Sequence, residues 1–75
     1  MAKSLIRNNI RKLRFHCAEM TQQQLAQKIG VTRQTVLAIE GDKYAPSLEV
    51  AFRMARVFGV PLEAVFRYED GLTPD

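Results

Sequence analysis

Residues 21–40 read TQQQLAQKIGVTRQTVLAIE, a run with the capping and terminating residues of two short helices joined by a tight turn. Thr21, followed three residues later by Gln24, has the form of a capping box, in which each side chain satisfies a backbone N–H that the helix leaves free. Gly30 marks the end of this helix, because glycine readily adopts the left-handed conformation found at helix C-termini. The pattern therefore predicts one helix from Thr21 to Gly30.

The second helix of this run begins only two residues after that glycine. Thr32 can cap it, and the helix is expected over residues 33–40. A connection this short forces the two helices to cross steeply rather than lie antiparallel. Val36 is expected to pack against Leu25 of the first helix and to fix the crossing angle. The run thus predicts a helix-turn-helix unit at about residues 21–40.

Three more helices are predicted outside this unit from apolar spacing, capping residues and terminal glycines. They run from Asn8 to Cys17, from Leu48 to Phe58 and over a short segment that begins at Pro61. The helix over residues 48–58 is apolar around much of its circumference, which predicts a central position in the fold. Its large apolar residues are expected in the core: Phe52, Met54 and Phe58.

Two short apolar segments lie near the chain ends, Ser4–Arg7 and Val65–Glu69. The second alternates apolar and polar residues and is rich in strand formers. Each segment fits either a helix end or a strand, and as strands the two would form a small antiparallel sheet. The predicted fold class is all-α, with five helices and room for this two-stranded sheet, in a single domain over residues 1–75.

Length and composition limit what else the chain contains. Its 75 residues support one small core. Cys17 is the single cysteine, so no intrachain disulfide forms, and together with His16 it supplies too few ligands for structural zinc. We expect no metal and no cofactor. No stretch approaches the roughly 20 apolar residues of a membrane span, and the N-terminal residues do not resemble a signal peptide, which predicts a cytoplasmic protein without membrane association.

The net charge of +3 is unevenly distributed along the chain. Residues 1–43 carry eight basic and three acidic side chains, a net charge of +5. Residues 44–75 carry three basic and five acidic side chains, a net charge of −2. A cationic half fits a polyanionic partner, although a solvated surface without a partner gives the same imbalance.

The outer face of the helix over residues 33–40 has the chemistry needed to read the major groove of DNA, which admits one α-helix. Arg33 can donate two hydrogen bonds to guanine, and Gln34 can pair in the same way with adenine. Leu37 and Ala38 are small and apolar, so they can contact a thymine methyl group and let the helix sit deep. These four residues are the predicted base contacts.

Four other residues are predicted to contact phosphates. Gln22, at the start of the first helix of the unit, can donate through its amide and lies beside free backbone N–H groups. The others are Thr35, Lys43 and Tyr44. Such contacts supply affinity and salt dependence rather than sequence choice.

The longer run TQQQLAQKIGVTRQTVLAIEGDKYAPSLEVAFRMARVFGVPLEAVF resembles the Cro/C1-type helix-turn-helix family, also called the XRE family. The resemblance extends over about residues 10–66. It is most similar to the short members that have no separate ligand domain, and it implies a lambda-repressor-like domain. Members bind operator DNA as dimers and usually repress transcription, which implies a prokaryotic regulator that acts on double-stranded DNA at a palindromic operator.

The resemblance also implies roles for particular residues. It assigns Gln22 to a phosphate and the four residues named above to bases. It suggests a structural ion pair between Arg14 and Glu40, for which ordinary surface charge is the alternative. The turn at residues 16–20 departs from the family pattern, because it is one residue longer and has no glycine.

A homodimer is the expected assembly, since one domain of this size contacts few bases and two half-sites double the readout. In short family members the flanking segments can pair as strands, and the C-terminal region can form the dimer contact. That places residues 65–75 as a dimerisation segment or tail. The expected interface residues are Leu5, Ile6, Val65, Phe66 and Tyr68; packing within one subunit fits Phe66 and Tyr68 equally well.

Other functions fit the sequence less well. An enzyme is not expected, because the chain has no recognisable nucleophile with a base, no catalytic carboxylate pair and no phosphate loop. No small-molecule ligand is evident either. Single-stranded nucleic acid is disfavoured because the basic half carries few stacking aromatics, namely Phe15 and Tyr44. The main alternative is an antitoxin-like module that binds a protein partner through its C-terminal segment.

Overall fold

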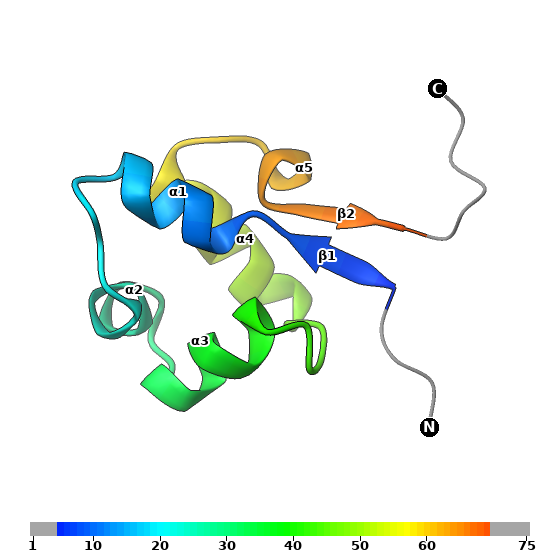
Figure 1. The fold of residues 1–75 in the computed structure, drawn as a ribbon, viewed down its shortest axis with the longest axis horizontal. Helices are drawn as coiled ribbons and strands as arrows, with labels where there is room; N and C mark the ends of the chain where they lie inside the picture. Colours follow the sequence, from blue (N-terminus) through cyan, green and yellow to red (C-terminus); the bar gives the residue numbers. More distant parts are fainter. Residues whose placement is uncertain (1–4, 70–75) are drawn as a thin grey trace.

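The computed structural model describes residues 5–69, which contain five helices and a two-stranded sheet (Figure 1). In chain order the elements are β1 (Ile6–Asn8), α1 (Ile10–His16), α2 (Gln22–Ile29), α3 (Arg33–Glu40), α4 (Leu48–Phe58), α5 (Leu62–Val65) and β2 (Phe66–Tyr68). The five-helix prediction and the small antiparallel sheet are both confirmed. No helix within this part of the chain has the length and apolar character to span a membrane.

Local capping determines where α2 and α3 begin. The Thr21 hydroxyl accepts from the Gln24 backbone N–H at 3.0 Å, and the Gln24 side chain accepts from the Thr21 backbone N–H at 2.9 Å, which confirms the capping box. Gly30 ends α2 with φ +77°, a left-handed conformation that glycine adopts without strain. Thr32 then caps α3 by accepting from the Thr35 backbone N–H at 3.2 Å. The two helices are therefore separated by three residues, one more than predicted, because α2 ends at Ile29.

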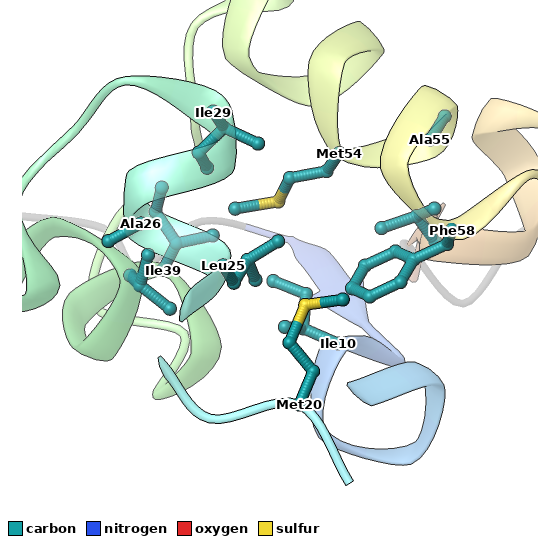
Figure 2. Close-up of a cluster of buried hydrophobic side chains, with 11 residues drawn as sticks. Ile10, Met20, Leu25, Ala26, Ile29, Ile39, Met54, Ala55 and Phe58 are labelled. Carbon is teal, nitrogen blue, oxygen red and sulfur yellow. The ribbon is translucent and has the colours of Figure 1, made fainter. Parts of the chain in front are cut away.

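The core lies between α4 and the other helices (Figure 2). Met54 points from α4 toward the apolar side chains of α2, and Phe58 lies beside Met20 and Ile10. The prediction that Phe52 belongs to this core is wrong, because its side chain is 53% exposed. At the start of the same helix, Leu48 is 68% exposed. The apolar surface of α4 is therefore wider than the core that it contacts.

Within the described residues, the two segments near the chain ends form strands rather than helix ends. β1 and β2 are antiparallel, with Arg7 opposite Arg67 at the centre of the ladder. The Glu69 backbone N–H donates to the Leu5 carbonyl at 2.8 Å and extends the pairing. Ser4 of the first predicted segment and residues 70–75 of the predicted dimerisation segment lie outside the described residues.

α1 is shorter than the predicted span from Asn8 to Cys17. Asn9 occupies the N-cap position, but Asn8 makes the capping contact, since its Oδ1 accepts from the Ile10 backbone N–H at 3.1 Å. After the helix, Ala18 and Glu19 both have positive φ angles, of 56° and 55°. This turn takes the left-handed path without glycine, at a steric cost.

Candidate nucleic-acid interface

The outer face of α3 carries most of the predicted base-contacting side chains. Arg33, Gln34 and Leu37 are exposed, whereas Ala38 is half-buried. On the opposite side of the helix, Val36 and Ile39 are in the core. This division holds the helix against the domain through its apolar side and leaves the arginine and amide side chains at the surface.

An ion pair joins the end of α3 to α1. Arg14 donates from Nε to Glu40 Oε2 and from Nη2 to Glu40 Oε1, each at 2.9 Å. A third bond runs from Arg14 Nη1 to the Met20 carbonyl at 2.9 Å, in the turn that leads to α2. One guanidinium therefore connects α1, the turn before α2 and the last residue of α3.

Gln22 lies at the edge of this cluster. Its side-chain Nε2 donates to Glu40 Oε1 at 3.2 Å, so the amide that was predicted to contact a phosphate faces the carboxylate in this structure. One of the two amide N–H groups is used by this bond, and the second has no partner among the described contacts. The side chain is half-buried and is held beside the outer face of α3.

The remaining predicted phosphate contacts lie on α3 and in the loop after it. Lys43 and Tyr44 are exposed. Thr35 is half-buried, and its hydroxyl is 3.0 Å from that of Thr32. A hydrogen bond between Asn8 Nδ2 and Asp42 Oδ1, 3.0 Å long, fixes the loop just before Lys43.

Asn8 is a positioning residue that the sequence analysis did not find. Besides Asp42, its amide donates to the carbonyl of Ile39 at 3.0 Å, near the C-terminus of α3. The same side chain accepts from the backbone N–H of Ile10, as described above. One asparagine thus ties β1, the start of α1 and the end of α3 together. Its partners on the α3 side lie 31 and 34 positions away in the sequence, so only the folded structure reveals these contacts.

Phe15 lines two open grooves on the surface formed by α1, α2 and α3. The larger one is lined by residues of α1 and by Gln22, Leu37, Glu40 and Gly41. The second lies toward the start of α2 and includes Gln22, Arg33 and Glu40. Both grooves also contain Arg11 and Phe15, which the sequence analysis did not assign to the interface.

The expected dimer residues separate into two groups. Leu5 and Tyr68 are exposed, and Ile6 and Phe66 are half-buried, so all four present some surface. Val65 does not: it is the last residue of α5 and is fully buried in the core of its own chain. Its prediction as an interface residue is corrected, because its side chain is already enclosed by the domain.

Comparison with known proteins identifies relatives over most of the chain. A family model described as helix-turn-helix matches residues 18–65. A protein named as an uncharacterized HTH-type transcriptional regulator of Methanocaldococcus jannaschii is 52% identical over 61 residues, which are 79% of this chain and 92% of that protein. A second protein named as an uncharacterized HTH-type transcriptional regulator, from Bacillus subtilis, is 38% identical over 65 residues, which are 87% of this chain and 97% of that protein.

Two further comparisons concern a phage protein and a solved structure. A cryptic phage transcriptional repressor of Vibrio cholerae is 36% identical over 73% of this chain and 49% of its own length. The crystal structure of a putative DNA-binding protein from Bacteroides fragilis superposes with a TM-score of 0.73, over 83% of this chain and 98% of that one, at 21% identity. At that level of identity the structural match shows the fold alone.

Proposed function

This chain belongs to the Cro/C1-type helix-turn-helix family of DNA-binding transcriptional regulators, and from that premise we propose that it represses transcription as a homodimer on a palindromic operator. In this proposal α3 enters the major groove. Arg33 and Gln34 read base edges through paired hydrogen bonds, and Leu37 and Ala38 supply apolar contact. The matched proteins named above are regulators and a repressor, not enzymes.

One observation carries the proposal: the polar face of α3 is exposed while the helix itself is rigidly held. Val36 and Ile39 attach it to the core, and the Arg14–Glu40 pair fixes its C-terminal end. A helix that reads bases must be positioned before it binds, since a mobile one would lose affinity to the cost of ordering it. The start of α3, with Arg33 and Gln34, is also its positive dipole end.

Contacts to the phosphates on either side would set the register of the helix. Gln22 reaches one strand from the start of α2, with its free amide N–H as donor. Lys43 and Tyr44 reach the other from the loop after α3. We place Thr35 in the same group, although its hydroxyl already has a partner in Thr32.

The dimer is proposed to form at the end of the molecule where β1 and β2 pair. Exposed Leu5 and Tyr68 lie there with half-buried Ile6 and Phe66. A two-fold axis through this sheet would present two copies of α3, which fits half-sites about one helical turn apart. Residues 70–75 continue from β2 and are included in this segment only as a prediction.

Selection of bound sequences from a pool of random duplex DNA tests the function. The expected result is enrichment of an inverted repeat whose two halves lie about 10 base pairs apart, centre to centre. A single unrepeated motif would overturn the homodimer while keeping sequence-specific binding. If no duplex is enriched even at low salt, the regulator function is wrong, and co-purification of a partner from the native cell tests the protein-binding alternative.

A further inference from the structure

We propose that Arg11, Lys12 and Phe15 on α1 form an additional binding strip for the phosphodiester backbone of the same duplex. This inference rests on the proposed function and enlarges its interface beyond α2, α3 and the loop that follows. The ligand class is a DNA strand, bound through phosphate charge and through the apolar surface of its sugars. None of the three residues was assigned to the interface from the sequence.

The strip is continuous with the base-reading surface. The larger groove is lined by Arg11 and Lys12 of α1 together with Leu37 of α3. The second groove, which Phe15 also lines, contains both Arg11 and Arg33, the first residue of α3. A duplex seated on α3 therefore brings a strand next to α1, and the two grooves offer a path for it.

Charge in the larger groove favours an anion. Arg11 and Lys12 are exposed and form no ion pair within residues 5–69. Among the residues lining this groove, Glu40 alone is acidic. Its carboxylate is already neutralised, because it accepts two hydrogen bonds from Arg14 and one from Gln22. The groove thus has two unpaired cations and no unpaired acid, which is the electrostatic signature of a polyanion site.

A role in this strip explains why the aromatic ring of Phe15 remains 53% exposed on a charged surface. The Arg11 guanidinium carbon lies 5.7 Å from the ring centre, and that of Arg14 lies 5.9 Å from it. A guanidinium over a ring is held by cation–π attraction, and its N–H groups keep their outward directions. The ring therefore orients Arg11 before binding and leaves its donors free for a phosphate. It also offers apolar surface for a deoxyribose.

The experiment uses three single variants of the full chain and one double variant, and it measures duplex affinity at several salt concentrations. Arg11→Gln removes the proposed phosphate contact. Arg56→Gln is the matched control, since Arg56 is also exposed but lines neither groove. Phe15→Leu removes the cation–π partner and keeps an apolar side chain. Thermal unfolding by circular dichroism verifies that each variant is folded, and all three sites are exposed.

We expect Arg11→Gln to reduce the slope of log K against log salt by about 0.9, the value for one phosphate contact, and Arg56→Gln to leave the slope unchanged. In a double-mutant cycle, Arg11→Gln should lose about two- to fivefold less affinity in the Phe15→Leu background, in line with the strength of an exposed cation–π contact.

Equal slopes for Arg11→Gln and Arg56→Gln would overturn the strip, and so would an Arg11→Gln loss of duplex affinity that is the same with and without Phe15→Leu. Both outcomes leave the wild-type protein bound to its duplex. A wild-type protein that binds no duplex refutes the proposed function itself, so the two failures are distinguishable.

Discussion

Arg14 of α1 and Glu40 of α3 are joined by two parallel hydrogen bonds of 2.9 Å, from Nε to Oε2 and from Nη2 to Oε1. Their side chains are only 11% and 13% exposed. This fork-to-fork geometry is the strongest form of a side-chain ion pair and has little water to screen it. It attaches the last residue of α3 to α1, so the position of the proposed recognition helix depends on it.

Replacing one member of this pair is expected to destabilise the fold. Glu40→Gln keeps the shape but leaves the Arg14 charge with a neutral partner, which should lower the free energy of unfolding by about 1–3 kcal/mol in urea titrations. The exposed pair of Glu49 and Arg53, with side chains 74% and 50% exposed, is the control. Glu49→Gln should cost less than about 1 kcal/mol. Equal losses of unfolding free energy in Glu40→Gln and Glu49→Gln would mean that burial of the Arg14–Glu40 pair adds nothing to its contribution.

Arg33→Ala is expected to weaken binding to the selected operator by about 1–3 kcal/mol and to relax base choice at one position in each half-site. The physical reason is the loss of two hydrogen bonds to one base. Binding to a panel of single-base operator variants measures this. Uniform weakening across the whole panel would identify Arg33 as a phosphate contact instead.

Lys43→Ala is expected to lower affinity for every duplex alike. The exposed ammonium follows the loop fixed by Asn8 and Asp42, so it should neutralise one phosphate without reading a base. The salt slope should fall by about 0.9. Titrations at four or more salt concentrations give this slope, and an unchanged value removes Lys43 from the interface.

Two alanine-to-glycine changes, one in the turn after α1 and one within α3, are expected to change the stability of the fold in opposite directions. Ala18 has φ 56°, a conformation that costs a residue with a Cβ about 1–2 kcal/mol. After allowance for the greater freedom of glycine in the unfolded chain, Ala18→Gly should stabilise the protein by up to about 1 kcal/mol. Ala38→Gly, within α3, should destabilise it by about 1 kcal/mol. Thermal or urea unfolding tests both, and a loss at Ala18 would refute the argument.

Tyr68→Glu is expected to dissociate the dimer. Tyr68 is exposed on β2, and removal of an aromatic anchor from a small interface should raise the dimer dissociation constant at least tenfold. Sedimentation equilibrium measures it. Phe52→Glu alters an aromatic of similar exposure on α4 and should leave the dimer intact. The reverse result would move the interface to α4.

Features determined by neighbouring residues could be predicted from the sequence. The caps at Thr21 and Thr32 form as expected, and Ser47 caps α4 in the same way, because each cap needs only a hydroxyl and a backbone N–H three residues away. The glycine ends of α2 and α4 follow from the same local logic, since Gly30 and Gly59 are both left-handed. These signals were sufficient to place the helix-turn-helix unit and the exposed face of α3.

Features that depend on distant contacts could not be predicted. The segment that begins at Val65 fits either a helix end or a strand, and the family resemblance places Val65 at the dimer contact, but the last turn of α5 puts it in the core. Phe52 is a large apolar residue of the kind that usually fills a core, but its side chain lies outside the core. Arg11 and Phe15 are four residues apart on α1, so their contact is local, but their position beside α3 appears only once the helices are packed.

The ladder between β1 and β2 also means that the chain enters and leaves the domain at one place. Leu5 and Glu69 are directly hydrogen-bonded, and paired strands lie about 5 Å apart. A surface loop of an unrelated host protein could therefore be opened and joined to these two residues without being stretched. The whole module can be transplanted as a single insert, and the host would gain the α3 surface while its own termini stay where they were.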